Sequence, residues 1–251
     1  MSPSASLEFA GLQIQFDALD PGPLELVQAA TRVSPTVVAG QDHRSPVLRA
    51  QLSVGPEPRW VPNGRDRAAA ESPLDVTSFV AVLRAAMCQA LAPEGALVHA
   101  AGIALDGQGV LLVAPSEGGK TTISRLLSSH ADILSDETIG VRPDATRPGR
   151  YALYGSCFWS GPAYPSRAGA FPLRAICFLR KGALSLAPLS RARALQELLA
   201  QLYLPIGATA IVDSLGVAAR MIDSAPVSGL SFALESNPVP LLRELLARVR
   251  E

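Results

Sequence analysis

Cysteine is scarce in this sequence, and its arrangement excludes two kinds of structural site. The chain of 251 residues has three cysteines, Cys88, Cys157 and Cys177, which are widely spaced and form no CxxC pair. Disulfide frameworks need an even set of cysteines, and structural zinc sites need closely spaced ligands. We therefore expect reduced thiols in a cytoplasmic protein, with neither disulfides nor zinc.

The chain also lacks a long hydrophobic run and an excess of charge of either sign. Its longest strongly apolar stretch, residues 96–105, contains His99 and is shorter than the roughly 20 residues that cross a bilayer. The N-terminus has no basic start followed by an apolar run, so we expect no secretory signal. The 22 basic and 22 acidic residues cancel. This balance argues against nucleic acid or an anionic membrane as a partner.

Lysine is rarer still. Among the 22 basic residues only Lys120 and Lys181 are lysines, and all the others are arginines. A chain that uses arginine nearly everywhere has some reason to keep lysine where it does. Lys120 lies in the segment that carries the clearest chemical motif.

The length allows one large domain or two small ones, and the 48% hydrophobic content is ample for a core. Residues 1–92 are predicted to form a small α/β region that ends in a linking helix. Ser72 is the expected N-cap of that helix and Pro73 its first residue, and apolar residues recur every three or four positions up to Leu91. The other predicted elements of the region are strands within 7–16 and at 47–54, a short helix at 23–31, and a loop at 55–70.

Residues 93–251 are predicted to form a larger α/β unit built on a mixed sheet. Residues 106–109, Asp-Gly-Gln-Gly, separate two apolar strands and predict a tight connection between them. The predicted strands are 96–105, 110–114, 133–134, 138–142, 151–158, 173–180, 184–189 and 228–235, and the predicted helices are 120–128, 192–202, 210–222 and 239–249. The predicted fold class is therefore α/β, with many strands around one phosphate-loop-like turn.

Residues 110–127, VLLVAPSEGGKTTISRLL, consist of an apolar strand, a loop of small residues and an amphipathic helix. A phosphate-binding loop requires this context. Its backbone N–H groups can point at phosphate oxygens, and the helix N-terminus favours negative charge. Lys120 would reach the β- and γ-phosphates of ATP, and the Thr121 hydroxyl would be a ligand of Mg²⁺. The expected nucleotide-binding residues are Ser116, Glu117, Gly118, Gly119, Lys120, Thr121 and Thr122.

The motif departs from GxxxxGK[ST] in its loop. Ala114 stands where the first glycine belongs, and Glu117 adds a negative charge beside the phosphates unless its side chain points outward. The alternative is an ordinary surface loop, since Gly-Gly-Lys-Thr also arises by chance. The flanking strand and helix and the rarity of lysine favour phosphate binding.

A second motif, Ser135-Asp136-Glu137, places two carboxylates at the end of an apolar strand. Metal–phosphate sites are often completed in this way. Successive side chains of a strand point to opposite faces, so both carboxylates can face one site only if the strand bends, and Ser135 makes a bend reasonable. The alternative is a solvated turn. Asp136 follows Lys120 by only sixteen residues, which differs from the more distant Walker B motif of transport and motor ATPases.

His99 lies in a predicted strand beside the loop. A lone histidine is usually a buried side chain with a hydrogen-bond partner, and the residues alone leave that alternative open.

Taken together, residues 96–142 resemble the core of the HPr kinase/phosphorylase family and its relatives, which share the phosphoenolpyruvate carboxykinase-like fold. That family shows a histidine on a strand, a glycine turn, a second strand, a GxSGxGK[ST] loop, a helix, and a strand that ends in Asp-Asp. The resemblance implies that core fold, the cofactors ATP and Mg²⁺, and a homo-oligomer. It implies catalytic roles for Asp136, His99 and Lys120, with Asp136 as the base toward an acceptor hydroxyl. It also implies metal ligation by Thr121 and Glu137, with Glu137 replacing the usual second aspartate.

One departure separates the chain from the HPr kinases proper. They carry a Gly-Arg-Asn loop near the C-terminus for substrate recognition and the reverse reaction, and nothing like it follows Lys181. The chain therefore resembles diverged relatives, some of peptide-modification pathways and some acting on free serine. We predict an ATP-dependent kinase that phosphorylates a hydroxyl, with serine favoured, of a peptide, a protein or a small molecule. The alternatives are a catalytically degenerate nucleotide-binding scaffold or regulator, and a phosphatase or ATP hydrolase.

Overall fold

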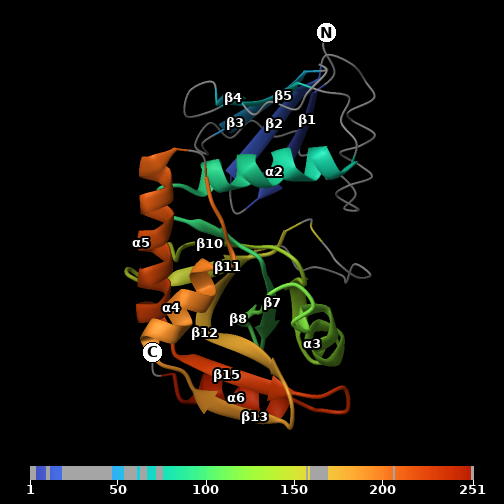
Figure 1. The fold of residues 1–251 in the computed structure, drawn as a ribbon, viewed down its shortest axis with the longest axis vertical. Helices are drawn as coiled ribbons and strands as arrows, with labels where there is room; N and C mark the ends of the chain where they lie inside the picture. Colours follow the sequence, from blue (N-terminus) through green and yellow to red (C-terminus); the bar gives the residue numbers. More distant parts are fainter. Residues whose placement is uncertain are drawn as a thin grey trace.

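The computed structural model describes residues 4–9, 12–18, 47–53, 61–62, 67–71, 76–156, 158, 169–205 and 207–249. These residues form two β-sheets and the helices between and around them (Figure 1). The smaller sheet belongs to the N-terminal part of the chain. The larger sheet forms the body of the molecule and carries the predicted site.

The N-terminal sheet has five strands in the order β1-β2-β3-β5-β4. β1 and β2 pair antiparallel, as the pattern of residues 7–16 predicts, and β3 lies parallel to both β2 and β5. The strands are β1 (Ser4–Phe9), β2 (Leu12–Ala18), β3 (Val47–Ser53), β4 (Val61–Pro62) and β5 (Arg67–Glu71).

The loop predicted over residues 55–70 is wrong in part. Residues 61–62 form β4 and residues 67–71 form β5, because the backbone of β5 pairs with β3 on one side and with β4 on the other. Local composition, rich in Pro, Gly and charge, masked this long-range pairing. The helix predicted at 23–31 and the Ser72-Pro73 helix start lie outside the described residues.

The larger sheet is mixed and mostly antiparallel. It has ten described strands. Eight of them follow the order β14-β6-β10-β11-β12-β8-β7-β9, and the other two lie off this path, with β15 paired to β12 and β13 paired to β15. Among these described strands, only β12 with β8 and β12 with β15 pair in parallel. The strands are β6 (Ala96–Val98), β7 (Ala100–Leu105), β8 (Gln108–Val113), β9 (Asp132–Ser135), β10 (Ile139–Pro143), β11 (Tyr151–Tyr154), β12 (Ala170–Lys181), β13 (Ser185–Pro188), β14 (Leu202–Tyr203) and β15 (Val227–Phe232). The fold class is therefore α/β with a mixed sheet.

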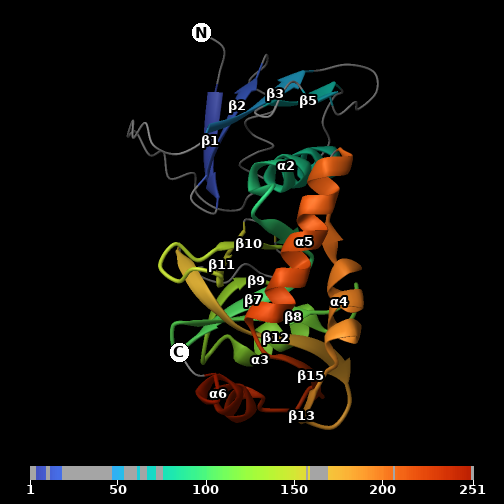
Figure 2. The ribbon, with the colours of Figure 1, turned by 90° about the vertical axis from the view of Figure 1, so that its left-hand side faces the viewer.

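Helices cover both faces of this sheet (Figures 1 and 2). They are α3 (Lys120–Leu127), α4 (Arg191–Leu199), α5 (Ala208–Ser224) and α6 (Val239–Ala247). Leu111 and Val113 of β8 belong to the core beneath α4 and α5, whereas Val110 and Leu112 belong to the core beneath α3 and α6. This alternation explains why the β8 sequence is apolar throughout, since both faces of a covered strand are buried.

The strand predicted over residues 96–105 is divided at His99. β6 pairs with β10 and β14, whereas β7 pairs with β8 and β9, at the opposite end of the strand order. The chain therefore bends between the two strands.

The helix predicted at 192–202 is also too long. The helix ends at Leu199, and residues 202–203 form β14 against β6. This pairing brings Gln201 beside His99.

Helix α2 (Val76–Leu91) contacts strands of both sheets (Figure 1). Leu83, Met87 and Leu91, which belong to its predicted apolar face, are all buried. None of the helices in the described part of the chain is long and apolar enough to cross a membrane.

Two buried thiols provide a test of the packing. Burial raises the pKa of both Cys88 and Cys177 to about 12, an effect that Arg84 partly opposes at Cys88. At about pH 8 both folded thiols are protonated and shielded, so iodoacetamide should leave them unmodified and should label them after unfolding in urea. Mass spectrometry of the digested chain measures this. Rapid labelling of either thiol under native conditions would contradict the packing around it.

Candidate functional site

The glycine loop, residues 114–119, connects the end of β8 to the start of α3. Gly119 has a φ of 98°, and a Cβ built there would lie 2.9 Å from Cζ of Phe232. A Cβ on Gly118 would lie 2.6 Å from the Cβ of Ala114 and 2.9 Å from the carbonyl oxygen of Pro115. A side chain at either glycine would collide with its surroundings, so both are needed for this path of the backbone.

Helix α3 begins without a side-chain cap. Its N-cap is Gly119, and no side chain of the described residues accepts a capping hydrogen bond from the first turn. Ser116 and Glu117 of the loop are exposed, while Thr121 and Thr122 of the first turn are partly buried. Uncapped N–H groups and the positive end of the helix dipole favour an anion at this position.

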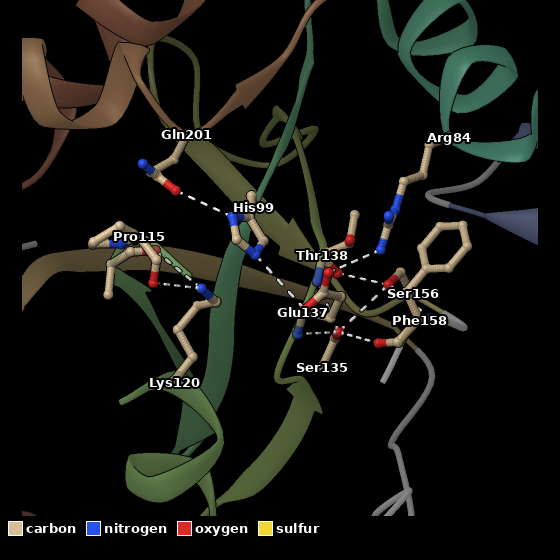
Figure 3. Close-up of polar contacts among 11 residues, drawn as sticks. Arg84, His99, Pro115, Lys120, Ser135, Glu137, Thr138, Ser156, Phe158 and Gln201 are labelled. Atoms are coloured by element: carbon tan, nitrogen blue, oxygen red, sulfur yellow. Dashed lines mark hydrogen bonds and ion pairs between the residues drawn. The ribbon is translucent and has the colours of Figure 1, made fainter. Parts of the chain in front are cut away.

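Lys120 is the first residue of α3, and its side chain is buried. Its Nζ donates to the carbonyl oxygens of Ala114 and Pro115, each at 3.0 Å (Figure 3). These bonds use two of the three ammonium donors. Burial lowers the pKa of Lys120, and the charges of Glu137 and Asp136 oppose this effect. The ammonium is therefore held against the carbonyl oxygens of the loop.

Two serine hydroxyls hold the turn that follows β9. Ser135 Oγ donates to the carbonyl oxygen of Phe158 at 2.6 Å and accepts the N–H groups of Glu137 and Thr138, each at 3.1 Å. Ser156 Oγ donates to the carbonyl oxygen of Thr138 at 2.6 Å. The chain bends after Ser135, as predicted, and these bonds fix the direction in which the acidic pair, Asp136 and Glu137, leaves it.

The two carboxylates of the acidic pair differ in exposure. Asp136 is completely buried, whereas the side chain of Glu137 is 20% exposed. Both raise the pKa of Lys120 against the effect of burial. Because β7 pairs with the end of β8 on one edge and with the end of β9 on the other, the glycine loop and the acidic pair lie at neighbouring strand ends. Solvent reaches Glu137 but not Asp136.

His99 lies at the bend between β6 and β7, opposite the start of the glycine loop. Its neighbour Ala100 pairs with Val113, the last residue of β8. Nδ1 of His99 lies 3.1 Å from Oε1 of Gln201, and Nε2 lies 3.7 Å from Oε2 of Glu137 (Figure 3). The imidazole therefore lies between the acidic pair and Gln201, the residue before β14, and the Tyr203 ring lies edge-on to it at 6.1 Å between centroids.

Arg84, on α2, joins His99 and the acidic pair in one cluster of polar side chains, and the sequence analysis did not predict it. Its Nη2 donates to Oε1 of Glu137 at 3.0 Å, and its guanidinium lies over the rings of Phe158 and Tyr203, 4.7 and 5.1 Å from their centroids. A signal was available, because Arg84 is the only charged residue in the apolar segment Val76–Leu91. A lone charge on an otherwise apolar helix usually has a specific partner.

These residues fit a nucleoside triphosphate with Mg²⁺. The uncapped start of α3, the close-packed glycines and Lys120 suit the phosphates. Mg²⁺ in such sites takes one or two protein ligands and completes its shell with phosphate oxygens and water. Thr121 and the acidic pair offer oxygen donors of that kind. The described residues contain no cluster of three or more His, Cys, Asp or Glu side chains that could hold a metal by themselves.

A cavity of about 510 Å³ lies apart from this cluster. It is lined in part by Arg150, Tyr151, Arg220 and Ser224, at the end of the β10–β11 pair that is remote from the acidic turn. Arg220 Nε donates to the Tyr151 hydroxyl at 3.1 Å, and Arg150 donates to the carbonyl of Ser224. Its described lining includes none of the predicted site residues.

Comparison with solved structures finds the HPr(Ser) kinase/phosphatase from Coxiella burnetii. The two chains are 12% identical, and the match covers 61% of this chain and 93% of that one with a TM-score of 0.29. A TM-score this low does not establish a common fold. No curated protein matches the sequence.

A family model described as SynChlorMet cassette protein ScmC matches residues 67–202. This range covers more than half of the chain. It contains Arg84, His99, the glycine loop, the acidic pair and Gln201. The chain therefore belongs to the ScmC family of SynChlorMet cassette proteins.

Proposed function

We propose that this chain is an ATP-dependent kinase that transfers the γ-phosphoryl group to a hydroxyl, with serine favoured, of a peptide, a protein or a small molecule. The observation that carries the proposal is that the acidic pair and the uncapped start of α3 with Lys120 follow strands β9 and β8, whose ends flank the start of β7. Phosphoryl transfer depends mainly on positioning and on charge stabilisation. A fixed cation, a helix N-terminus and a carboxylate base supply both.

In this proposal each group has a stated role. The loop amides and Lys120 bind the phosphates, and Thr121 and Glu137 would hold Mg²⁺, which when bound neutralises charge on the phosphate oxygens. Asp136 accepts the proton of the attacking hydroxyl. A bond forms between that oxygen and the γ-phosphorus, the bond from the γ-phosphorus to the β–γ bridging oxygen breaks, and ADP leaves. Asp136 is buried, so this role requires the site to open around it when the acceptor binds.

The resemblance of residues 96–142 to the HPr kinase/phosphorylase core supports the same proposal. The resemblance also supports a phosphoenolpyruvate carboxykinase-like core for residues 93–251 and a homo-oligomer, and the sparse, unpaired cysteines support a cytoplasmic location. The absence of a Gly-Arg-Asn loop after Lys181 favours an acceptor other than HPr.

A second candidate is a nucleotide-binding protein without transfer activity. It is favoured by the position of Glu137, whose carboxylate is paired with Arg84 at 3.0 Å and lies 3.7 Å from His99. Nucleotide binding without transfer to free serine, to serine peptides or to water would support this candidate over the kinase.

Replacing Lys120 tests the phosphate site directly. Lys120→Met should weaken MgATP binding by at least roughly 30-fold, because it removes a buried charge that would face the phosphates. Isothermal titration calorimetry measures the loss. The matched control is Lys181→Met, which removes the other, exposed lysine and should leave binding unchanged. An unaltered ATP affinity in Lys120→Met would remove the assignment.

Replacing Asp136 tests whether this residue is the general base or a metal ligand. Asp136→Asn should keep ATP affinity within about tenfold while phosphoryl transfer falls by ~10²-fold or more, the usual scale for a lost general base. Glu137→Gln is the comparison. Because it removes a proposed metal ligand, it should raise the Mg²⁺ concentration that half-maximal activity requires. If Asp136→Asn instead loses nucleotide binding and keeps transfer per bound ATP, the two roles are reversed.

Replacing His99 asks whether the histidine serves the site or only the fold. His99→Ala should lower turnover with little change in melting temperature, because the side chain is partly exposed and its polar contacts are with Glu137 and Gln201. Thermal melts and assays on the same preparation provide both quantities. A loss of about 1–3 kcal/mol in stability with normal activity per folded molecule would make His99 structural.

A further inference from the structure

The Arg84 guanidinium lies over two aromatic rings and donates a hydrogen bond to Glu137. The rings of Phe158 and Tyr203 lie against it, 4.7 and 5.1 Å from its central carbon, and the side chain is only 23% exposed. Stacking on aromatic faces leaves the in-plane N–H groups of a guanidinium free to bind a carboxylate. The aromatic rings therefore restrict the position of the Arg84 guanidinium, and with it the position of the contact with Glu137.

Glu137 is the shared partner in this part of the cluster. One of its oxygens accepts from Arg84 at 3.0 Å, and the other lies 3.7 Å from His99. Its charge also acts on Lys120. Two groups from separate segments, Arg84 and His99, thus converge on the one carboxylate of the acidic pair that solvent reaches.

We propose that Arg84 is a positioning residue that sets the divalent-metal affinity of the site by competing with the metal for Glu137. This inference rests on the proposed function, in which Glu137 would be a metal ligand. A carboxylate that is hydrogen-bonded to a guanidinium has part of its charge neutralised and a lone pair occupied. A metal ion must either displace Arg84 or bind beside a second cation, and both weaken its binding. Helix α2 thereby limits how tightly the site holds a metal.

The test measures metal binding and needs no acceptor. Mn²⁺ binding to the full chain, saturated with a non-hydrolysable ATP analogue, is followed by the electron paramagnetic resonance signal of free Mn²⁺. The variants are Arg84→Met, which is of similar length and uncharged, Glu137→Gln, and the double variant. The control Arg125→Met removes an exposed arginine from the last turn of α3.

The proposal requires a coupling between the two residues. Arg84→Met should bind Mn²⁺ about tenfold more tightly than the unsubstituted chain, a usual size for contacting charged groups. In the Glu137→Gln background the same substitution should change Mn²⁺ affinity by less than about twofold, because the carboxylate for which metal and arginine compete is gone. Arg125→Met should have no effect. Arg84→Gln provides the same comparison if Arg84→Met does not fold.

Three results would overturn the proposal. Equal Mn²⁺ affinity in Arg84→Met and the unsubstituted chain would show that Arg84 does not compete for Glu137. If Arg84→Met loses nucleotide binding to the same extent with Glu137 present and in the Glu137→Gln background, Arg84 binds phosphate directly. If the unsubstituted chain binds neither nucleotide nor Mn²⁺, the proposed function fails with it, whereas normal nucleotide binding without the coupling overturns only the role of Arg84.

Discussion

Strand β8 is hydrogen-bonded along both edges and packed on both faces, and the position of the candidate site depends on this confinement. It pairs antiparallel with β7 and parallel with β12, while its alternate residues enter two separate cores. A shift of one residue would move Leu111 and Leu112 into each other's core, so the register is strongly fixed. The glycine loop begins one residue after β8, and its N-terminal anchor is therefore rigid. Preorganised loops of this kind need such a support.

The second constraint is the balance of charge beside that loop. Lys120 and Asp136 are both buried, and an isolated buried charge would be strongly destabilising. The charges of the acidic pair favour the charged form of the lysine, and Glu137 in turn contacts Arg84 and lies 3.7 Å from His99. Each charged group thus compensates another, so replacing one member alters the environment of the rest. Such networks are better measured by pairs of substitutions than by single ones.

The parts of the site that follow from local sequence were predictable, and the parts that depend on distant pairing were not. The apolar strand before Lys120, the helix after it and the bend at Ser135 can all be inferred from a few neighbouring residues. Arg84 meets Glu137 across 53 positions, and His99 meets Gln201 across 102. No periodicity within one element encodes these contacts. The break at His99 was missed for the same reason, because it results from the pairing of β6 with β10 and β14. The different burial of Asp136 and Glu137 likewise depends on packing across the sheet.

Arg84 has a consequence for how the chain can be divided. The predicted division of the chain places a boundary after residue 92, and a fragment that starts there would retain the glycine loop, the acidic pair and the large sheet. It would lose α2, and with it the cation that donates to Glu137 and lies over the rings of Phe158 and Tyr203. The two parts are therefore not interchangeable modules, since a tilt of α2 against the smaller sheet would be transmitted to the acidic pair through a single guanidinium. A chimera whose N-terminal part lacks an arginine at position 84 would have a differently charged site, even though every residue of the loop is unchanged.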